Sequence, residues 1–265
     1  MSSMSVRLVV RLGATELLLF WRNKTALLTA LSVPVIGFGI HNMMRVDDAE
    51  PESAALGPAW LATAMVAIIV LFVVYYNLVT AYVARREELV LKRLRAGEAR
   101  DGEILTGAAF PAIVIALLQT VLVMVGAAVA YELPAPVNPV LVVLGVVAGI
   151  VICVLLAAMS TAFTRTVELA QVSTLPVLMV CMFGSGALVP LEAMPDAVRA
   201  VARFVPLTPV VDLLRLGWLG TADSAAPVDM AGTFAQAFAP LGIIALWVVV
   251  GVYGMRRWFR WEPRR

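Results

Sequence analysis

Charged residues are scarce in this sequence. They make up 14% of the 265 residues, whereas a soluble domain carries about a quarter. Hydrophobic residues make up 62%, and the mean hydropathy is +0.93. So little charge cannot cover a water-facing surface, which predicts an integral membrane protein. The net charge of +2 is too small to indicate a nucleic-acid groove.

Metal ligands are equally rare. The only histidine is His41, and neither a CxxC nor an HExxH spacing occurs. The two cysteines, Cys153 and Cys181, lie inside apolar runs, where a thiol packs as a small hydrophobe. We therefore expect two free packing cysteines and no metal site.

A nucleotide site is missing as well. The phosphate-binding loop needs a lysine directly after a glycine, but Lys24 and Lys92, the only lysines, follow Asn23 and Leu91. The long apolar segments contain no carboxylate, which excludes acid–base hydrolysis inside the bilayer. We therefore expect neither enzymatic activity nor a cofactor in this chain, and any ATP must be hydrolysed by another polypeptide.

Long uncharged segments are what the sequence has in abundance. Splitting it at every charged residue leaves six long windows, and a helix of about 20 apolar residues crosses a bilayer. We expect an all-α membrane fold, with residues 1–265 forming one transmembrane domain. The six expected spans are 25–44, 57–84, 106–130, 138–163, 169–190 and 234–255.

Basic residues cluster in alternate connections between these spans. All but four of the 20 lie in the N-terminal segment, the 85–103 loop, the short fourth-to-fifth connection or the C-terminal tail. Basic loops stay in the cytoplasm, so both termini are predicted to be cytoplasmic. The 191–229 segment is predicted to be external.

Three regions outside the spans show helical periodicity. Residues 5–22 suit either a helix in the cytoplasmic interface or a solvated flank. Residues 86–103 predict a short amphipathic helix, with a solvated loop as the alternative. Residues 195–204 and about 209–219 predict two short, half-buried interfacial helices that cap the outer end of the bundle.

Two segments carry a family resemblance. Residues 86–96 (REELVLKRLRA) and 185–215 are similar to the signature after the second span, and to the exit and return of the fifth span, in ABC-2 type permeases. These are the membrane subunits of ATP-binding-cassette exporters. The first segment departs from the family pattern at Leu89, where glycine is frequent, and at Glu98, where proline is frequent.

The resemblance implies a half-transporter. Two permease chains, as a homodimer or a heterodimer, would lie in the lipid bilayer above two cytoplasmic ABC ATPase subunits, which bind ATP and Mg²⁺. The segment after span two would contact the ATPase and pass its movement to that span. The coupling residues implied in this way are Arg86, Glu87, Glu88, Leu91, Lys92, Leu94 and Arg95.

A pocket between the two permease chains is also implied, lined mainly by the second and fifth spans. Polar residues of those spans are candidates for contact with substrate, but small and hydroxyl side chains also serve in helix packing. The candidates are Tyr75, Tyr76, Asn77, Thr80, Ser173, Thr174 and Ser185.

The substrate class follows from the same resemblance and from the apolar spans. Compact members resemble daunorubicin-type drug exporters, whereas others of the same shape move polysaccharide or glycolipid. An apolar pocket with few hydroxyls favours a hydrophobic or amphipathic molecule that is drug-like or lipid-like. Eighteen arginines against two lysines suit a GC-rich bacterial genome, antibiotic efflux and a cytoplasmic (plasma) membrane. A secondary carrier or structural subunit that works without ATP is the alternative from another class.

Overall fold

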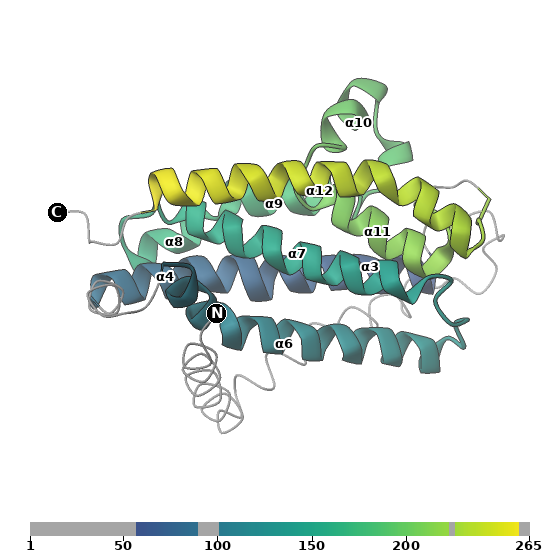
Figure 1. Cartoon of the computed structure of the whole chain (residues 1–265), viewed down its shortest axis with the longest axis horizontal. Helices are drawn as coiled ribbons and strands as arrows, with labels where there is room; N and C mark the ends of the chain where they lie inside the picture. The colour runs from purple at the N-terminus through teal and green to yellow at the C-terminus, as the bar shows by residue number, and fades with distance from the viewer. Residues whose placement is uncertain (1–56, 90–100, 223–225, 260–265) are drawn as a thin grey trace.

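The computed structural model describes residues 57–89, 101–222 and 226–259. Within these ranges every regular element is a helix, and five helices are long and apolar enough to cross a membrane. They lie side by side along the long axis of the molecule (Figure 1). This confirms the expected all-α membrane fold for the described part. The expected first span, 25–44, and the 5–22 segment lie outside it.

Each of the five long helices overlaps one expected span. We call the second and fifth of the six expected spans span two (Pro58–Glu87) and span five (Val167–Gly184). The elements are α3 (Pro58–Ile69), η2 (Val70–Tyr76), α4 (Asn77–Glu87), α6 (Asp101–Ala130), α7 (Pro139–Ser160), α8 (Val167–Ser173), α9 (Leu175–Gly184), η3 (Leu191–Ala193), α10 (Asp196–Ala202), α11 (Thr208–Leu219) and α12 (Met230–Trp258).

Side-chain caps define the start of three helices. Asn138 accepts a hydrogen bond from the Leu141 amide at 3.3 Å, just before Pro139 opens α7. Thr166 caps α8 in the same way, and Asp229 caps α12. Such oxygens satisfy amides that have no partner inside the helix. The starts of these helices therefore follow from local sequence.

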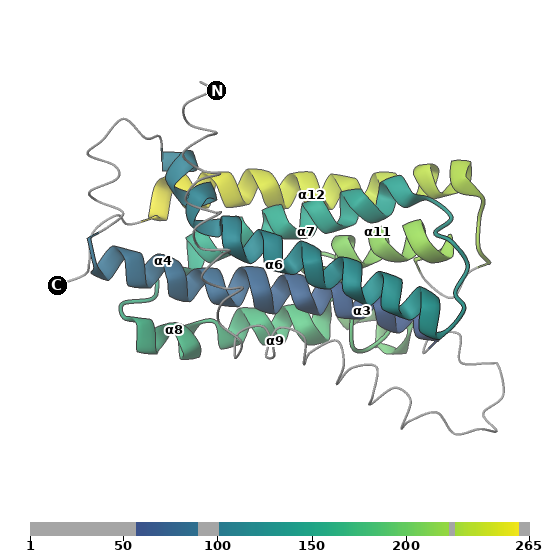
Figure 2. The ribbon, with the colours of Figure 1, turned by 90° about the horizontal axis from the view of Figure 1, so that it is seen from below.

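Span two is the central helix of the described bundle. It packs against α6, α7, α8 and α11, and Figure 2 shows it running between α6 and span five. Its middle stretch, η2, is a π-helix, whose turns are wider than those of an α-helix. Val70–Tyr76 contains no proline or glycine, so the sequence gives no sign of the change from α-helix to π-helix.

α11 is buried inside the bundle, so the prediction of a half-buried interfacial helix at 209–219 was wrong. It packs against α7, α12 and α3, and ten of its 12 residues are buried. The prediction failed because Arg215, the only basic residue of α11, is buried in the bundle and does not face the membrane surface. The guanidinium donates to the Gly186 carbonyl (Nη2–O 2.7 Å) and stacks 4.8 Å from the Trp60 ring centroid. These contacts compensate for burying the charge.

α10 stays at the surface, as expected for the first of the two short helices. Figure 1 shows it projecting from the bundle, and the Val201 side chain is 70% exposed. Arg199 folds back to donate to the carbonyls of Leu191 and Glu192, both at 3.0 Å. The arginine therefore holds α10 to the turn that precedes it.

The expected 86–103 helix is interrupted. Span two continues to Glu87, so Arg86 and Glu87 belong to its last turn. The chain then turns at Leu89, whose φ of 59° is the left-handed conformation that commonly ends a helix. The last residues of the expected helix, from Asp101, instead begin α6. Residues 90–100 lie outside the described part.

Candidate functional site

One face of span two is left open by the other described helices. We call it the open face and define it by Phe72, Tyr76, Asn77 and Thr80, which are half-buried or exposed. Leu78, by contrast, is buried in the bundle. Three of the four are residues that the sequence put forward for the substrate path. Phe72 was missed, because nothing in the sequence distinguishes it from other apolar residues of the span.

The open face combines aromatic carbon with amide and hydroxyl groups. The rings of Phe72 and Tyr76 lie with their centroids 6.4 Å apart. Asn77 Nδ2 donates to the Val73 carbonyl at 3.2 Å, and Thr80 Oγ1 donates to the Tyr76 carbonyl at 3.4 Å. Both bonds use donors, so the amide and hydroxyl oxygens retain capacity to accept. Such a surface can contact the apolar body of a molecule and also hydrogen-bond its polar groups.

Tyr75 points into the bundle rather than to the open face. It is fully buried, and its hydroxyl lies 3.1 Å from Ser160 Oγ at the end of α7. This contact joins span two to α7. Tyr75 and Tyr76 are neighbours in the chain, yet only Tyr76 belongs to the open face.

The three span-five candidates make contacts within the chain. Ser173 Oγ lies 2.7 Å from Thr164 Oγ1, and Thr174 Oγ1 donates to a carbonyl of its own helix at 2.8 Å. Ser185 is buried and accepts from the Ala187 amide at 3.3 Å. These contacts agree with a role of small hydroxyl residues in helix packing.

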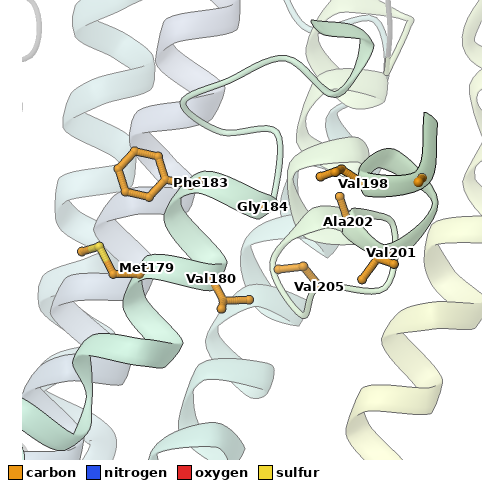
Figure 3. Close-up of a pocket in the computed structure, with 9 residues that line it drawn as sticks. Met179, Val180, Phe183, Gly184, Val198, Val201, Ala202 and Val205 are labelled. Atoms are coloured by element: carbon orange, nitrogen blue, oxygen red, sulfur yellow. The ribbon is translucent and has the colours of Figure 1, made fainter. Parts of the chain in front are cut away.

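An apolar groove between α9 and α10 was not anticipated from the sequence. Its volume is about 600 Å³, and Figure 3 shows Val180 and Val205 on opposite sides of it. Its lining is almost entirely apolar, so it suits apolar groups. The lining residues are Met179, Val180, Phe183, Gly184, Ala197, Val198, Val201, Ala202 and Val205.

Arginines gather where span two ends, and we call this the basic end of the bundle. It includes the C-terminus of α7 and the start of α8, which pack against α4. Carboxylates share this end, among them Glu87, Glu88 and Glu168. Its described arginines are Arg85, Arg86, Arg165, Arg256 and Arg257.

Arg86 is buried at the basic end, with only 1% of its surface exposed. Its Nη1 donates to the Thr161 carbonyl at 2.9 Å, and its Nη2 donates to the carbonyls of Thr164 at 2.6 Å and Arg165 at 3.1 Å. These carbonyls directly follow α7. The guanidinium therefore caps the C-terminal end of α7, where a positive charge is favoured.

Of the other expected coupling residues, two lie in the described part and four lie outside it. Glu87 and Glu88 are exposed at the end of span two, where a partner could reach them. Arg86 differs from both, because its side chain binds the turn after α7 within its own chain. Outside the described residues lie Leu91, Lys92, Leu94 and Arg95.

Metal chemistry has no candidate among the described residues. In those ranges, no three side chains of His, Cys, Asp or Glu gather closely enough to hold an ion. Cys153 and Cys181 are buried and free, which confirms their interpretation as packing residues. The open face and the basic end thus remain as the candidate functional regions.

Comparison with known proteins gives one finding that covers most of the chain. The sequence model of the ABC-2 type transporter family matches residues 7–218. No curated protein matches the sequence. The matched residues include span two, α6, α7, span five and nearly all of α11. Family members are membrane subunits that work with a separate ATPase subunit. The chain therefore belongs to the ABC-2 type transporter family and is a multi-pass permease subunit of an ABC transporter.

Proposed function

We propose that this permease moves a drug-like or lipid-like amphipathic molecule out of a bacterial cell across the cytoplasmic membrane. Two permease chains bring their open faces around a shared path, and two ATPase subunits bind at the basic end. The observation that carries the substrate class is the chemistry of the open face, which places Phe72 and Tyr76 beside Asn77 and Thr80.

The open face differs from the exposed surface of α6. There the large exposed side chains are aliphatic, such as Leu118 and Val125, which is what lipid tails require. An amide inside a membrane span is unfavourable against hydrocarbon and is normally turned toward another protein surface, water or a ligand. The position of Asn77 therefore supports a role for the open face in a transport path.

Polysaccharide or glycolipid export is the second candidate. The pair of rings at Phe72 and Tyr76 supports it, because aromatic faces stack on sugar rings. The two candidates differ in what else the path must offer. A glycan needs many hydrogen-bond partners, whereas an amphipathic molecule needs a few polar groups in a mainly apolar pocket. The open face has few polar groups among apolar ones, so its composition favours an amphipathic molecule over a glycan.

The dependence on ATP is tested by purification of the tagged permease from its native cells. We expect it to retain a soluble ATPase that carries a glycine-rich phosphate loop. The reconstituted complex should then export an amphipathic fluorescent dye only when ATP is present. Dye movement by the permease alone, with no ATPase in the preparation, would instead favour a secondary carrier.

The substrate path is tested with Tyr76→Ala and Asn77→Ala. Loss of a contact worth about 1–2 kcal/mol raises the half-maximal substrate concentration about 5- to 30-fold. Leu118→Ala, at an exposed position of α6, is the control and should transport normally. Assays with the dye and with a short lipid-linked glycan separate the two substrate classes. Wild-type transport of both by the two path variants would remove the open face from the path.

The coupling segment is tested with Leu91→Asp and Leu94→Asp. A leucine buried at a subunit contact contributes about 1.5–3 kcal/mol, and a carboxylate there opposes docking. We expect the permease to insert and dimerise while ATP hydrolysis no longer drives transport. Glu87→Ala, at an exposed position, should have a milder effect. Wild-type transport by both aspartate variants would show that the segment is only a solvated loop.

A further inference from the structure

Polar contacts at the basic end join span two to α7 and to span five. We call these side chains the basic-end network: Tyr75, Arg86, Ser160, Thr164 and Ser173. Arg86 reaches the carbonyls after α7, Tyr75 pairs with Ser160 at the end of α7, and Thr164 pairs with Ser173 of α8. The network therefore runs from one helix of the expected substrate path to the other.

Arg86 is the stiffest link in this network. A guanidinium is planar and holds its donors in a fixed fork, and here it binds three carbonyls within one turn of chain. Separating the two surfaces would leave a buried charge and several carbonyls without these bonds, which is costly away from water. The end of span two and the 161–165 turn are therefore held together.

The 161–165 turn leads directly into span five. Thr166, the next residue, caps α8 through its bond from the Leu169 amide. The Thr164–Ser173 contact then ties the turn to the last residue of α8, and α4 also packs against α8. The 161–165 turn is thus bonded to α4 at one end and to α8 at the other. A displacement of α4 should therefore move α8 with it and not merely deform the turn.

We propose that Arg86 is a positioning residue that makes the basic ends of spans two and five move as one body. The proposal rests on the proposed function in one respect, because the ATPase is what displaces the segment after span two. A single displacement then shifts both helices of the path. This role differs from direct contact with the ATPase, because the Arg86 guanidinium binds carbonyls of its own chain.

The mechanical link is tested on the full-length permease in lipid nanodiscs. Spin labels are placed at the exposed positions Glu88 and Glu168, with Cys153 and Cys181 replaced by alanine. We expect one narrow distance distribution, unchanged when the ATP-loaded ATPase is added. Arg86→Met should broaden it even in the permease alone, and Arg86→Lys should restore part of the order because it keeps a charge.

Coupling is tested on the reconstituted complex as transport per ATP hydrolysed. Mutations along a coupling connection change the coupling by about 0.5–2 kcal/mol, so Arg86→Met should lower this ratio about 2- to 30-fold. Arg86→Lys should lie between it and wild type. Arg203→Met, which removes an exposed arginine at the end of α10, away from the basic end, is the control and should leave the ratio unchanged. A merely structural role would lower the amount of inserted complex and leave the ratio intact.

The two measurements separate this inference from the proposed function. A wild-type ratio together with a narrow distribution in Arg86→Met overturns the role of Arg86. If that variant does not insert, Arg86→Lys and Thr164→Val decide, and wild-type ratios in both overturn it equally. If no ATPase binds but Arg86→Met still broadens the distribution, the proposed function fails while the link between the two spans stands.

Discussion

Leu89 ends span two in a conformation that is unfavourable for any residue with a side chain. Its φ is 59°, and the left-handed region costs an L-residue about 1–2 kcal/mol. Glycine adopts that region freely, and glycine is frequent at this position in the permeases that the segment resembles. We therefore expect Leu89→Gly to raise the free energy of unfolding by about 0.5–1 kcal/mol. Thermal unfolding in detergent measures the change.

The neighbouring residue supplies the control for this prediction. Glu88 has a φ of −73°, in the right-handed helical region, where glycine brings no relief and loses more entropy on folding. Glu88→Gly should lower the free energy of unfolding by about 0.5–1 kcal/mol. Destabilisation of similar size by both substitutions would show that the backbone at Leu89 is not strained.

The Tyr75–Ser160 contact gives a second prediction at the scale of residues. Tyr75→Phe and Ser160→Ala each remove one partner of the 3.1 Å contact. A double-mutant cycle on unfolding should give a coupling energy of about 0.6 kcal/mol, the average between membrane helices. Because Tyr75 lies away from the open face, transport selectivity should not change in Tyr75→Phe. Altered selectivity with no coupling energy would place its hydroxyl in the substrate path.

At the scale of elements, the packing of α11 on α7 depends on a glycine. A Cβ at Gly217 would lie 2.7 Å from both Val142 Cγ2 and the Val142 backbone nitrogen, and backbone cannot move aside cheaply. We expect Gly217→Ala to destabilise the permease by about 1–3 kcal/mol. Gly242→Ala on α12 is the control, since nothing lies within 4 Å of its Cβ position. Equal unfolding midpoints for the two variants would contradict the close approach.

The described spans were predictable because hydrophobic length is enough to locate a membrane helix. The observed ends of these helices differ from the predicted ends by a few residues. α6 begins at Asp101 rather than at 106, because acidic residues are favoured in the first turn of a helix. α11 was not predictable, because Arg215 and Asp212 give it the pattern of an interfacial helix. Only contacts with Trp60 and Gly186 show where that arginine goes.

The sequence could indicate which helix carries the candidate site, but it could not indicate which side chains of that helix belong to the open face. The sequence proposed Tyr75 and Tyr76 together, and only the packing of α7 separates the buried ring from the open one. Likewise, Arg86 carries the same sequence signal as its charged neighbours. Its burial depends on the distant 161–165 turn, which no spacing within 86–96 could reveal.

For the molecule as a whole, the described arginines are distributed unevenly between the two ends of the bundle. The basic end holds arginines from α4, the turn after α7, and α12. The opposite half of the bundle carries the turn at Glu132 and the start of α12 at Asp229, and α10 projects from its side with Asp196, Arg199 and Arg203 (Figure 1). Basic segments remain on the cytoplasmic side of a membrane. The basic end should therefore face the cytoplasm, where an ATPase can bind it.

This orientation is tested with single cysteines at Glu88, beyond the end of span two, and at Asp196 in α10, both of which are exposed. The background replaces the buried Cys153 and Cys181 with alanine. A thiol reagent that does not cross membranes should label Asp196→Cys in intact cells, and Glu88→Cys only after the membrane is opened. A cysteine at Val142, which is buried in α7, should remain unlabelled in both conditions. Labelling of Glu88→Cys from outside would reverse the orientation and, with it, the side on which the ATPase binds.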